Sequence, residues 1–271
     1  MLVALLLAPA VPTRAQPAPA QQPPASAEQQ IYDRYRDWTY VVPVDQRGPG
    51  LMALYRTHLA QQGVADAEIE RQVATIEQEG RRLEAARWNA FFTTDRPRFS
   101  LMPNAFLVQI AERRTPGTAL DVGMGQGRNS IWLARQGWDV TGFDPADQAL
   151  AMARQQAAAL GLTLKTVTAR DDTFEWGESR WELILLSYAG CAGENVARVE
   201  KALKPGGILI VEAFHNDAAR DFKIGGSLCG TGELPHLFQG LRTVHYEEPI
   251  ALPDFGQVRM RIVRFAAEKP R

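Results

Sequence analysis

The sequence predicts an α/β protein: a doubly wound, mostly parallel seven-stranded sheet with an antiparallel C-terminal edge pair, preceded by a helical cap. A glycine-rich run at residues 119–130 joins a short apolar segment to the start of a helix, as ligand-binding loops in such sheets do. From residue 101 onward, short apolar segments alternate with helix-like stretches. Strands separated by helices pair in parallel through right-handed crossovers, so this alternation predicts the sheet.

The first 28 residues differ in composition from the rest. An apolar run at residues 2–8 is followed by Thr13, Arg14 and Ala15, which resembles a signal peptide with a cleavage site after Ala15. The run is too short to span a bilayer. Because a positively charged start is missing, two localisations stay open: export to the periplasm or medium, and the cytoplasm if the start codon is wrongly set or the leader is not cleaved. Residues 16–28 are rich in Pro, Ala and Gln and are expected to be a linker.

Residues 29–100 are expected to form a helical cap over the mouth of the following domain. Apolar residues at helical spacing predict helices at residues 51–62 and 66–92. Gly80 lies inside the longer helix, where it costs about 1 kcal/mol against alanine and allows a bend. An aromatic set in this region comprises Tyr32, Tyr35, Trp38, Tyr40, Trp88, Phe91 and Phe92. These rings either form a lid that excludes water from a site or pack the cap against the sheet.

Residues 101–271 are expected to form the ligand-binding domain. Helices are predicted at residues 104–113, 129–136, 145–160 and 195–203. Strands are predicted at residues 119–122, 139–143, 163–168, 183–186, 208–212, 241–248 and 258–266. The last two strands are joined without a strong helix, which favours an antiparallel pair at the edge of the sheet.

The glycine-rich run has the pattern D-x-G-x-G-x-G, in which Asp121 is followed by Gly123, Gly125 and Gly127. Glycine allows the backbone to take positive φ and lets a ligand approach the main chain closely. A dinucleotide fingerprint, G-x-G-x-x-G, would need its third glycine at Arg128. This offset argues against an NAD-linked oxidoreductase.

Composition and charge limit the classes of partner. The chain is 45% hydrophobic with a formal net charge of −1, so it can bury a core but has no basic footprint for a nucleic-acid backbone. No histidine or cysteine has metal-ligand spacing, so no metal is expected. The sequence leaves open whether Cys191 and Cys229 form a disulfide, and it says nothing of the oligomeric state.

Four segments, in order, resemble motifs of the class I S-adenosylmethionine (SAM)-dependent methyltransferases over residues 101–266. They are the glycine run, Val140-Thr141-Gly142-Phe143-Asp144, Trp181-Glu182-Leu183-Ile184-Leu185-Leu186 and Leu203-Lys204-Pro205-Gly206-Gly207. The first motif, in its Gly-Gln-Gly-Arg-Asn-Ser form, is most similar to that of tellurite-resistance-type small-molecule methyltransferases. The resemblance implies a Rossmann-like fold, SAM as co-substrate and a small-molecule methyl acceptor. The Asn/Asp-Pro-Pro-Tyr loop of nucleic-acid-methylating relatives is absent after the fourth strand.

The resemblance also implies how SAM is bound. Gly123, Gly125 and Gly127 would let the backbone wrap the methionine part and the ribose. Asp121 would steer the ammonium group of SAM, directly or through water. Asp144 would accept both ribose hydroxyls, a bidentate geometry that a carboxylate matches well.

Further candidates follow the third, fourth and fifth strands. Asp171, with its neighbour Asp172 as second choice, would accept from the adenine amino group, and Ser187 would lie beside the sulfonium. Tyr188 and His215 are the catalytic candidates at the mouth. His215 is placed either to act as a general base near neutral pH or simply to hydrogen-bond its loop.

The chemistry of SAM decides whether a base is needed. Its methyl group sits on a positively charged sulfur, so the leaving group is already activated and the enzyme mainly aligns the nucleophile. Alignment alone contributes roughly 7–11 kcal/mol. A thiolate, selenolate or oxyanion acceptor needs no base, whereas a phenol or amine can require one. The competing interpretation is a protein that binds SAM or a nucleotide without catalysis.

Overall fold

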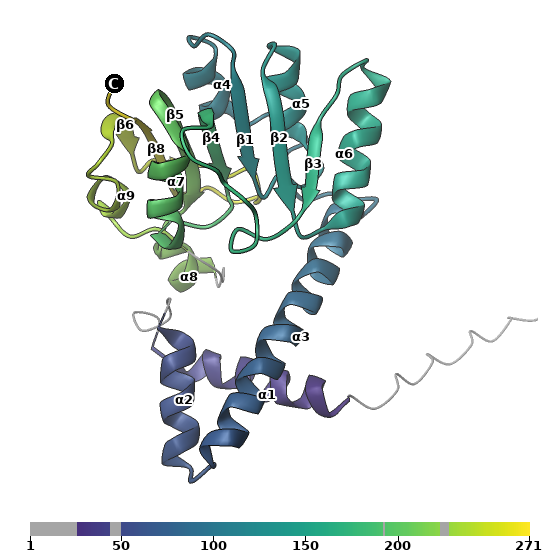
Figure 1. Cartoon of the computed structure of the whole chain (residues 1–271), viewed down its shortest axis with the longest axis vertical. Helices are drawn as coiled ribbons and strands as arrows, with labels where there is room; N and C mark the ends of the chain where they lie inside the picture. The colour runs from purple at the N-terminus through teal and green to yellow at the C-terminus, as the bar shows by residue number, and fades with distance from the viewer. Residues whose placement is uncertain (1–25, 44–49, 192, 223–227) are drawn as a thin grey trace, which may run out of the picture.

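The computed structural model describes residues 26–43, 50–191, 193–222 and 228–271, and its centre is an eight-stranded sheet (Figure 1). In spatial order the main path of the sheet is β3 (Lys165–Thr168), β2 (Asp139–Asp144), β1 (Thr118–Val122), β4 (Trp181–Ser187), β5 (Leu203–Phe214), β8 (Met260–Glu268) and β6 (Arg242–Glu247). The first five pair in parallel, β8 is antiparallel to both β5 and β6, and the short β7 (Ile250–Ala251) pairs with β8. The predicted doubly wound sheet with antiparallel C-terminal strands is confirmed.

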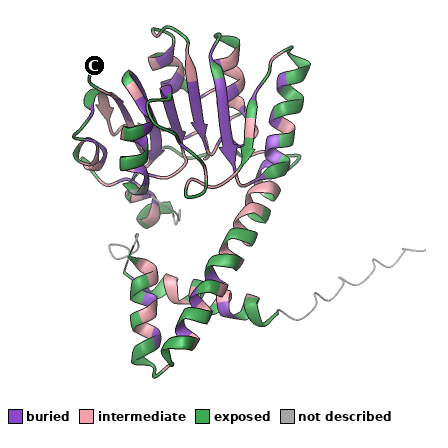
Figure 2. Ribbon diagram, viewed as in Figure 1, coloured by how far each residue is buried: buried purple, intermediate pink, exposed green. Residues whose placement is uncertain are grey.

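Both faces of the sheet are apolar. Alternate side chains of a strand point to opposite sides, and in the central strands both sets are hydrophobic. The helices around it are α4 (Ala105–Ala111), α5 (Arg128–Arg135), α6 (Asp147–Ala159), α7 (Val196–Ala202), α8 (Asp217–Phe222) and α9 (Glu233–Leu237). In β4, Leu183 and Leu185 belong to the core shared with α4, α5 and α6. Ile184 and Leu186 belong to the core shared with α7 and α9. All four side chains are buried, as are most of the central strands in Figure 2.

The strand order places a ligand crevice at one edge of the sheet. The order reverses between β1 and β4, and in open α/β sheets ligands bind beside the carboxyl ends of the strands at such a reversal. In Figure 1 these ends face the C-terminal turn of α3 (Asp66–Phe92). There the Asn89 side chain donates to Asp147 at 2.7 Å and accepts from the Gln148 amide at 3.0 Å. The end of α3 is therefore fastened to the start of α6, beside the crevice.

The remaining helices form a small core of their own. α1 (Ala27–Val41) begins after Ser26, whose side chain accepts from the Gln29 amide at 3.2 Å, and α2 (Leu51–Gln61) follows. Their shared core with α3 consists of Ile31, Tyr55, Leu59, Ile69, Val73 and Ile76. In Figure 1, α1 and α2 lie far from the sheet, and α3 runs unbroken through Gly80 to reach it.

Some features of the structure lie outside the sequence predictions. The short elements α8, α9 and β7 were not predicted, because segments of two to six residues show no full period. The proposed leader at residues 1–25 lies outside the described residues. Within the described part of the chain, no helix is both long and apolar enough to cross a membrane.

Candidate active site

The loop between β1 and α5 is built on three glycines with left-handed backbone conformations. Gly123, Gly125 and Gly127 have φ of 65°, 52° and 78°, values that disfavour any residue with a side chain. Gly127 is also the N-cap residue directly before α5. The conformational argument for these glycines therefore agrees with the structure. No side chain projects from the main chain at these three positions after β1.

Asp144 lies at the tip of β2, directly beside this loop. Its carboxylate accepts from the Gly125 amide at 2.9 Å and from the Ala146 amide at 2.8 Å. The side chain is buried, and burial raises its pKa above the ordinary range of an aspartate. The carboxylate thus holds the glycine loop in shape.

Asp121 lies at the end of β1 beneath the same loop. It is buried and accepts from the Ser130 hydroxyl at 2.7 Å. Burial raises the pKa of Asp121 to about 6, because the charged form is poorly solvated there. A positively charged ligand group nearby would favour the ionised form.

The two acids after β3 differ in their surroundings. Asp171 is half-buried and accepts from Asn195 Nδ2 at 2.9 Å. Asp172 is exposed and pairs with Arg170 at 3.2 Å. Arg170 in turn contacts Glu84 of α3. Asp171 therefore has a fixed position, whereas Asp172 belongs to a surface ion-pair group.

Ser187 and Tyr188 lie at the end of β4. Ser187 is buried next to Arg128, whose guanidinium donates to its hydroxyl at 3.3 Å. Tyr188 has a φ of 59°, and its hydroxyl donates to Glu212 at 2.9 Å and accepts from the Asp254 amide at 3.2 Å. Burial and the neighbouring carboxylates raise the pKa of Tyr188 well above its ordinary value, so the phenol stays protonated.

His215 follows β5 and is buried with both ring nitrogens engaged. One nitrogen contacts the Thr231 hydroxyl at 2.9 Å, and the other accepts from the Asp217 amide at 3.1 Å. The residue also forms a backbone bridge with Cys229. These contacts place His215 in a fixed loop rather than at an open surface.

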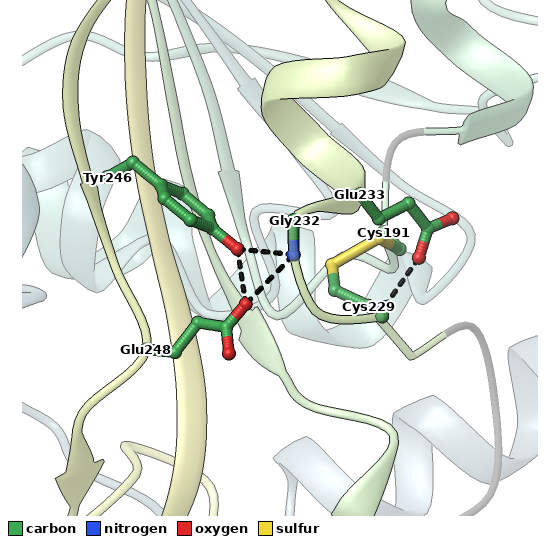
Figure 3. Close-up of a disulfide and its surroundings, with 7 residues drawn as sticks. Cys191, Cys229, Gly232, Glu233, Tyr246 and Glu248 are labelled. Carbon is green, nitrogen blue, oxygen red and sulfur yellow. Dashed lines mark hydrogen bonds between the residues drawn. A yellow bond between two sulfur atoms is a disulfide. The ribbon is translucent and has the colours of Figure 1, made fainter.

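A disulfide joins Cys191 to Cys229 (Figure 3). The two Cα atoms are 5.0 Å apart and the residues are separated by 38 positions in the sequence. The bond ties the loop that follows Tyr188 to the segment paired with His215. The question that the sequence left open about these two cysteines is thereby answered.

The crevice beside the glycine loop is closed by aromatic rings from distant parts of the chain. It contains a cavity of about 20 Å³, which is room for about one water molecule, and Phe92, Phe99 and Phe255 line it. A Cβ placed on Gly125 would lie 2.5 Å from the Phe92 ring, so that ring packs directly on the glycine. The other lining residues are Gly123, Met124, Gln126, Arg128, Asn129 and Ser187. The structure is thus a closed form of the site.

Sequence reasoning missed a buried polar cluster behind this cavity. The Glu212 carboxylate accepts from Asn104 Nδ2 at 2.6 Å, from Tyr188 at 2.9 Å and from Arg264 Nε at 2.6 Å. Asn104 also donates to Asp254 at 2.7 Å. An acid at the end of an apolar strand was the available signal for Glu212, but its partners come from separate elements and carry no local pattern.

No group of three or more His, Cys, Asp or Glu side chains in the described ranges is arranged to hold a metal ion. The donor groups around the loop are instead carboxylates, backbone amides and hydroxyls. These are the groups that bind ribose hydroxyls, an ammonium group and adenine. The site therefore has the chemistry of a nucleoside-binding site.

Comparisons with known proteins assign a family to this region. Residues 119–207 match a family described as a methyltransferase domain. The ribosomal RNA small subunit methyltransferase C of Alcanivorax borkumensis is 29% identical over 118 residues, which are 39% of this chain and 36% of that protein. The chain thus spans just over a third of the length of this curated relative.

Solved structures show the same fold. TehB from Haemophilus influenzae has a TM-score of 0.51 at 19% identity, covering 61% of this chain and 62% of that one. A 1,6-didemethyltoxoflavin-N1-methyltransferase from Burkholderia thailandensis, solved with S-adenosylhomocysteine, has a TM-score of 0.53 at 19% identity, covering 72% and 90%. A protein described for conversion of a disulfide bond into a thioacetal group during echinomycin biosynthesis has a TM-score of 0.54 at 19% identity, covering 69% and 92%.

The fold and the site together define an α/β domain with a glycine loop at the reversal of its strand order, where such sheets bind their ligands. The family match then makes the class specific. The chain contains a methyltransferase domain at residues 119–207. The match confirms the methyltransferase resemblance noted in the sequence, and the fold shared with TehB is consistent with its tellurite-resistance-type form.

Proposed function

We propose that this protein transfers the methyl group of SAM to a small-molecule acceptor whose nucleophile is already ionised, such as a thiolate, another soft chalcogen or an ionised oxygen. The observation that carries the proposal is the lining of the closed cavity. The described residues that line it include three aromatic rings and the Arg128 guanidinium, but no carboxylate, histidine or amine that could take a proton. Aromatic walls exclude water from the sulfonium, and the cation favours an anionic acceptor.

The proposal assigns SAM to the carboxyl ends of β1 and β2. Asp144 would accept the ribose hydroxyls, Asp121 would face the ammonium group, and the glycine amides would lie along the methionine part. Asp171 would accept from adenine, which fits its fixed position beside Asn195. Ser187 would lie next to the sulfonium, which fits its burial at the end of β4. These roles rest on the resemblance together with the contacts described above.

Tyr188 and His215 take positioning roles in this proposal. A Tyr188 phenol that stays protonated can donate to Glu212 and hold the Asp254 loop, but it does not act as a base. His215 already uses both ring nitrogens and is not among the residues that line the cavity. The proposal therefore requires an acceptor that is already ionised, because neither side chain is placed to take its proton.

Methyl transfer without a protein base makes a testable prediction about pH. With a series of aryl thiols of increasing acidity, we expect the midpoint of the kcat/KM profile to move with the pKa of each thiol, because the thiolate is the reactive form. The methylated thiol would be measured by mass spectrometry, with phenols, amines and a short ribosomal RNA fragment as alternative acceptors. We expect the RNA to be the weaker acceptor, because the chain has a formal net charge of −1 and lacks the amino-methylating loop after the fourth strand.

Two variants keep this test decisive. His215→Gln should leave the midpoint where the thiol sets it, and His236→Gln, at an exposed histidine, serves as the matched control. A midpoint that stays constant across the thiols and disappears in His215→Gln would mean that His215 is the base. Methylation of RNA alone would overturn the small-molecule acceptor, and SAM binding with no product from any acceptor would support the non-catalytic alternative.

The raised pKa of Asp121 predicts how SAM affinity depends on pH. The folded pKa is about 6, against about 4 for an aspartate in the unfolded chain, so burial of Asp121 costs stability progressively as pH rises through this window. The SAM ammonium group favours the carboxylate, so SAM binding releases the proton below about pH 6. We expect SAM affinity to rise about eightfold between about pH 5 and pH 6.5 and then to level off.

Calorimetric titration across this pH range measures the effect. In Asp121→Asn the pH dependence should flatten, leaving only what Asp144 contributes through its own raised pKa. An equally steep pH dependence in Asp121→Asn would show that the ammonium group lies elsewhere.

A further inference from the structure

Arg128 lies at the mouth of the closed site, and an internal carboxylate balances its charge. Its guanidinium donates to the Met102 carbonyl at 2.7 Å and to Asp254 Oδ2 at 2.7 Å. It also lies 5.4 Å from the centre of the Phe255 ring. Only 10% of the Arg128 side chain and 18% of the Asp254 side chain are exposed. Among these partners, Asp254 alone carries the opposite charge.

Asp254 belongs to the short loop between β7 and β8. Its carboxylate also accepts from Asn104 at 2.7 Å, its amide donates to the Tyr188 hydroxyl at 3.2 Å, and its carbonyl accepts from the Ser100 amide at 2.7 Å. On either side of it, Leu252 and Val258 are more than half exposed. The loop is therefore a surface segment held over the crevice by a few polar contacts.

The same loop closes the crevice with an aromatic ring. Phe255 stacks against Phe91 and Phe99 from the α3 side, with ring centres 5.9 Å and 5.6 Å apart. The cavity that remains is far smaller than SAM, so rings on at least one side must move before a ligand enters.

Movement of the loop has an electrostatic consequence. If Asp254 leaves with Phe255, the nearly buried Arg128 loses its counter-ion, and an unpaired buried charge is strongly unfavourable. A ligand that brings its own carboxylate restores the pair in the open form. Such a ligand therefore binds the open form better than the closed form, and it shifts the population of the protein toward the open form.

We propose that Arg128 is a specificity-determining residue that takes the carboxylate of a bound ligand in place of Asp254. This inference rests on the proposed function, because it concerns the same site. The ligand carboxylate replaces Asp254 on Arg128 without any proton transfer, and the released Asp254 carboxylate moves with its surface loop into water. The carboxylate comes either from the methionine part of SAM or from an acceptor that enters beside it. A ligand without a carboxylate leaves Asp254 on Arg128 and the loop closed.

Calorimetry with two matched pairs of ligands tests the proposal and separates the two sources. SAM is compared with decarboxylated SAM, and benzoate is compared with benzamide on the protein saturated with S-adenosylhomocysteine. The unaltered protein is expected to prefer the carboxylate member of at least one pair by about tenfold. Arg128→Gln should reduce that preference to about threefold or less. Asp254→Asn should raise the affinity for the same carboxylate ligand about fivefold, because the internal competitor for Arg128 loses its charge.

Arg135→Gln is the matched control, since Arg135 lies on the same helix and is exposed. It should keep the preference of the unaltered protein. A preference in the first pair assigns the carboxylate to SAM, and a preference in the second assigns it to the acceptor. The proposal is overturned if neither pair is discriminated, or if Arg128→Gln and Asp254→Asn both leave the preference unchanged. Discrimination without any methylated product would refute only the proposed function, whereas methylation without discrimination would refute only the role of Arg128.

Discussion

Replacement of Asp144 with alanine is expected to weaken SAM binding by about tenfold to a hundredfold. The carboxylate holds the Gly125 and Ala146 amides and is assigned to the ribose hydroxyls. Hydrogen bonds to a charged group contribute about 1.5–3 kcal/mol each, so the loss of one ribose contact and of the loop geometry accounts for this range. Isothermal titration calorimetry with SAM measures it.

Asp139→Ala is the matched control for this prediction. Asp139 begins the same strand but is exposed, and it pairs with Lys165 at 2.7 Å far from the crevice end of β2. Its replacement should leave SAM affinity within about twofold of the original, as surface substitutions usually do. If Asp144→Ala binds SAM as tightly as Asp139→Ala, the ribose assignment is wrong.

Phe92→Ala is expected to destabilise the fold and to tighten SAM binding at the same time. Phe92 is buried among Phe91, Phe99 and Trp88, and removal of such a ring costs about 3–5 kcal/mol of unfolding free energy. In the closed form its ring rests on Gly125, so SAM must first displace it. Re-exposing part of a phenylalanine costs about 1 kcal/mol, and the variant avoids that cost, which corresponds to about fivefold tighter binding.

Urea denaturation and calorimetry on one preparation measure both effects. Phe238→Ala is the control, because Phe238 is fully buried in the core shared with α7 and α9 and does not line the crevice. It should lose a comparable amount of stability without any gain in SAM affinity. Weaker SAM binding in Phe92→Ala than in Phe238→Ala would mean that the ring forms part of the bound site instead of blocking it.

The sheet and the cofactor loop could be predicted from the sequence because their signals are local. Gly123, Gly125 and Gly127 lie within five residues and each takes the positive φ that the spacing implied. Asp144 ends an apolar strand, and the geometry of parallel strands brings strand ends to one edge. Periodicity alone then separates buried strands from surface helices, as the two faces of β4 illustrate.

The closure of the site could not be predicted, since it depends on contacts between distant segments. Phe92, Phe99 and Phe255 meet over the glycine loop only after α3 docks on α6 and the β7–β8 loop folds across the edge. An aspartate next to a phenylalanine in a loop is too common to predict an ion pair with Arg128. Two cysteines also carried too little information to predict a disulfide.

The most direct test of the central claim is a crystal structure of the protein with S-adenosylhomocysteine. We expect the ligand along Gly123–Gly127, with its ribose hydroxyls on Asp144 and with the Phe92 ring displaced from Gly125. A crevice that remains closed at saturating S-adenosylhomocysteine, with the ligand bound elsewhere or not at all, would contradict the account.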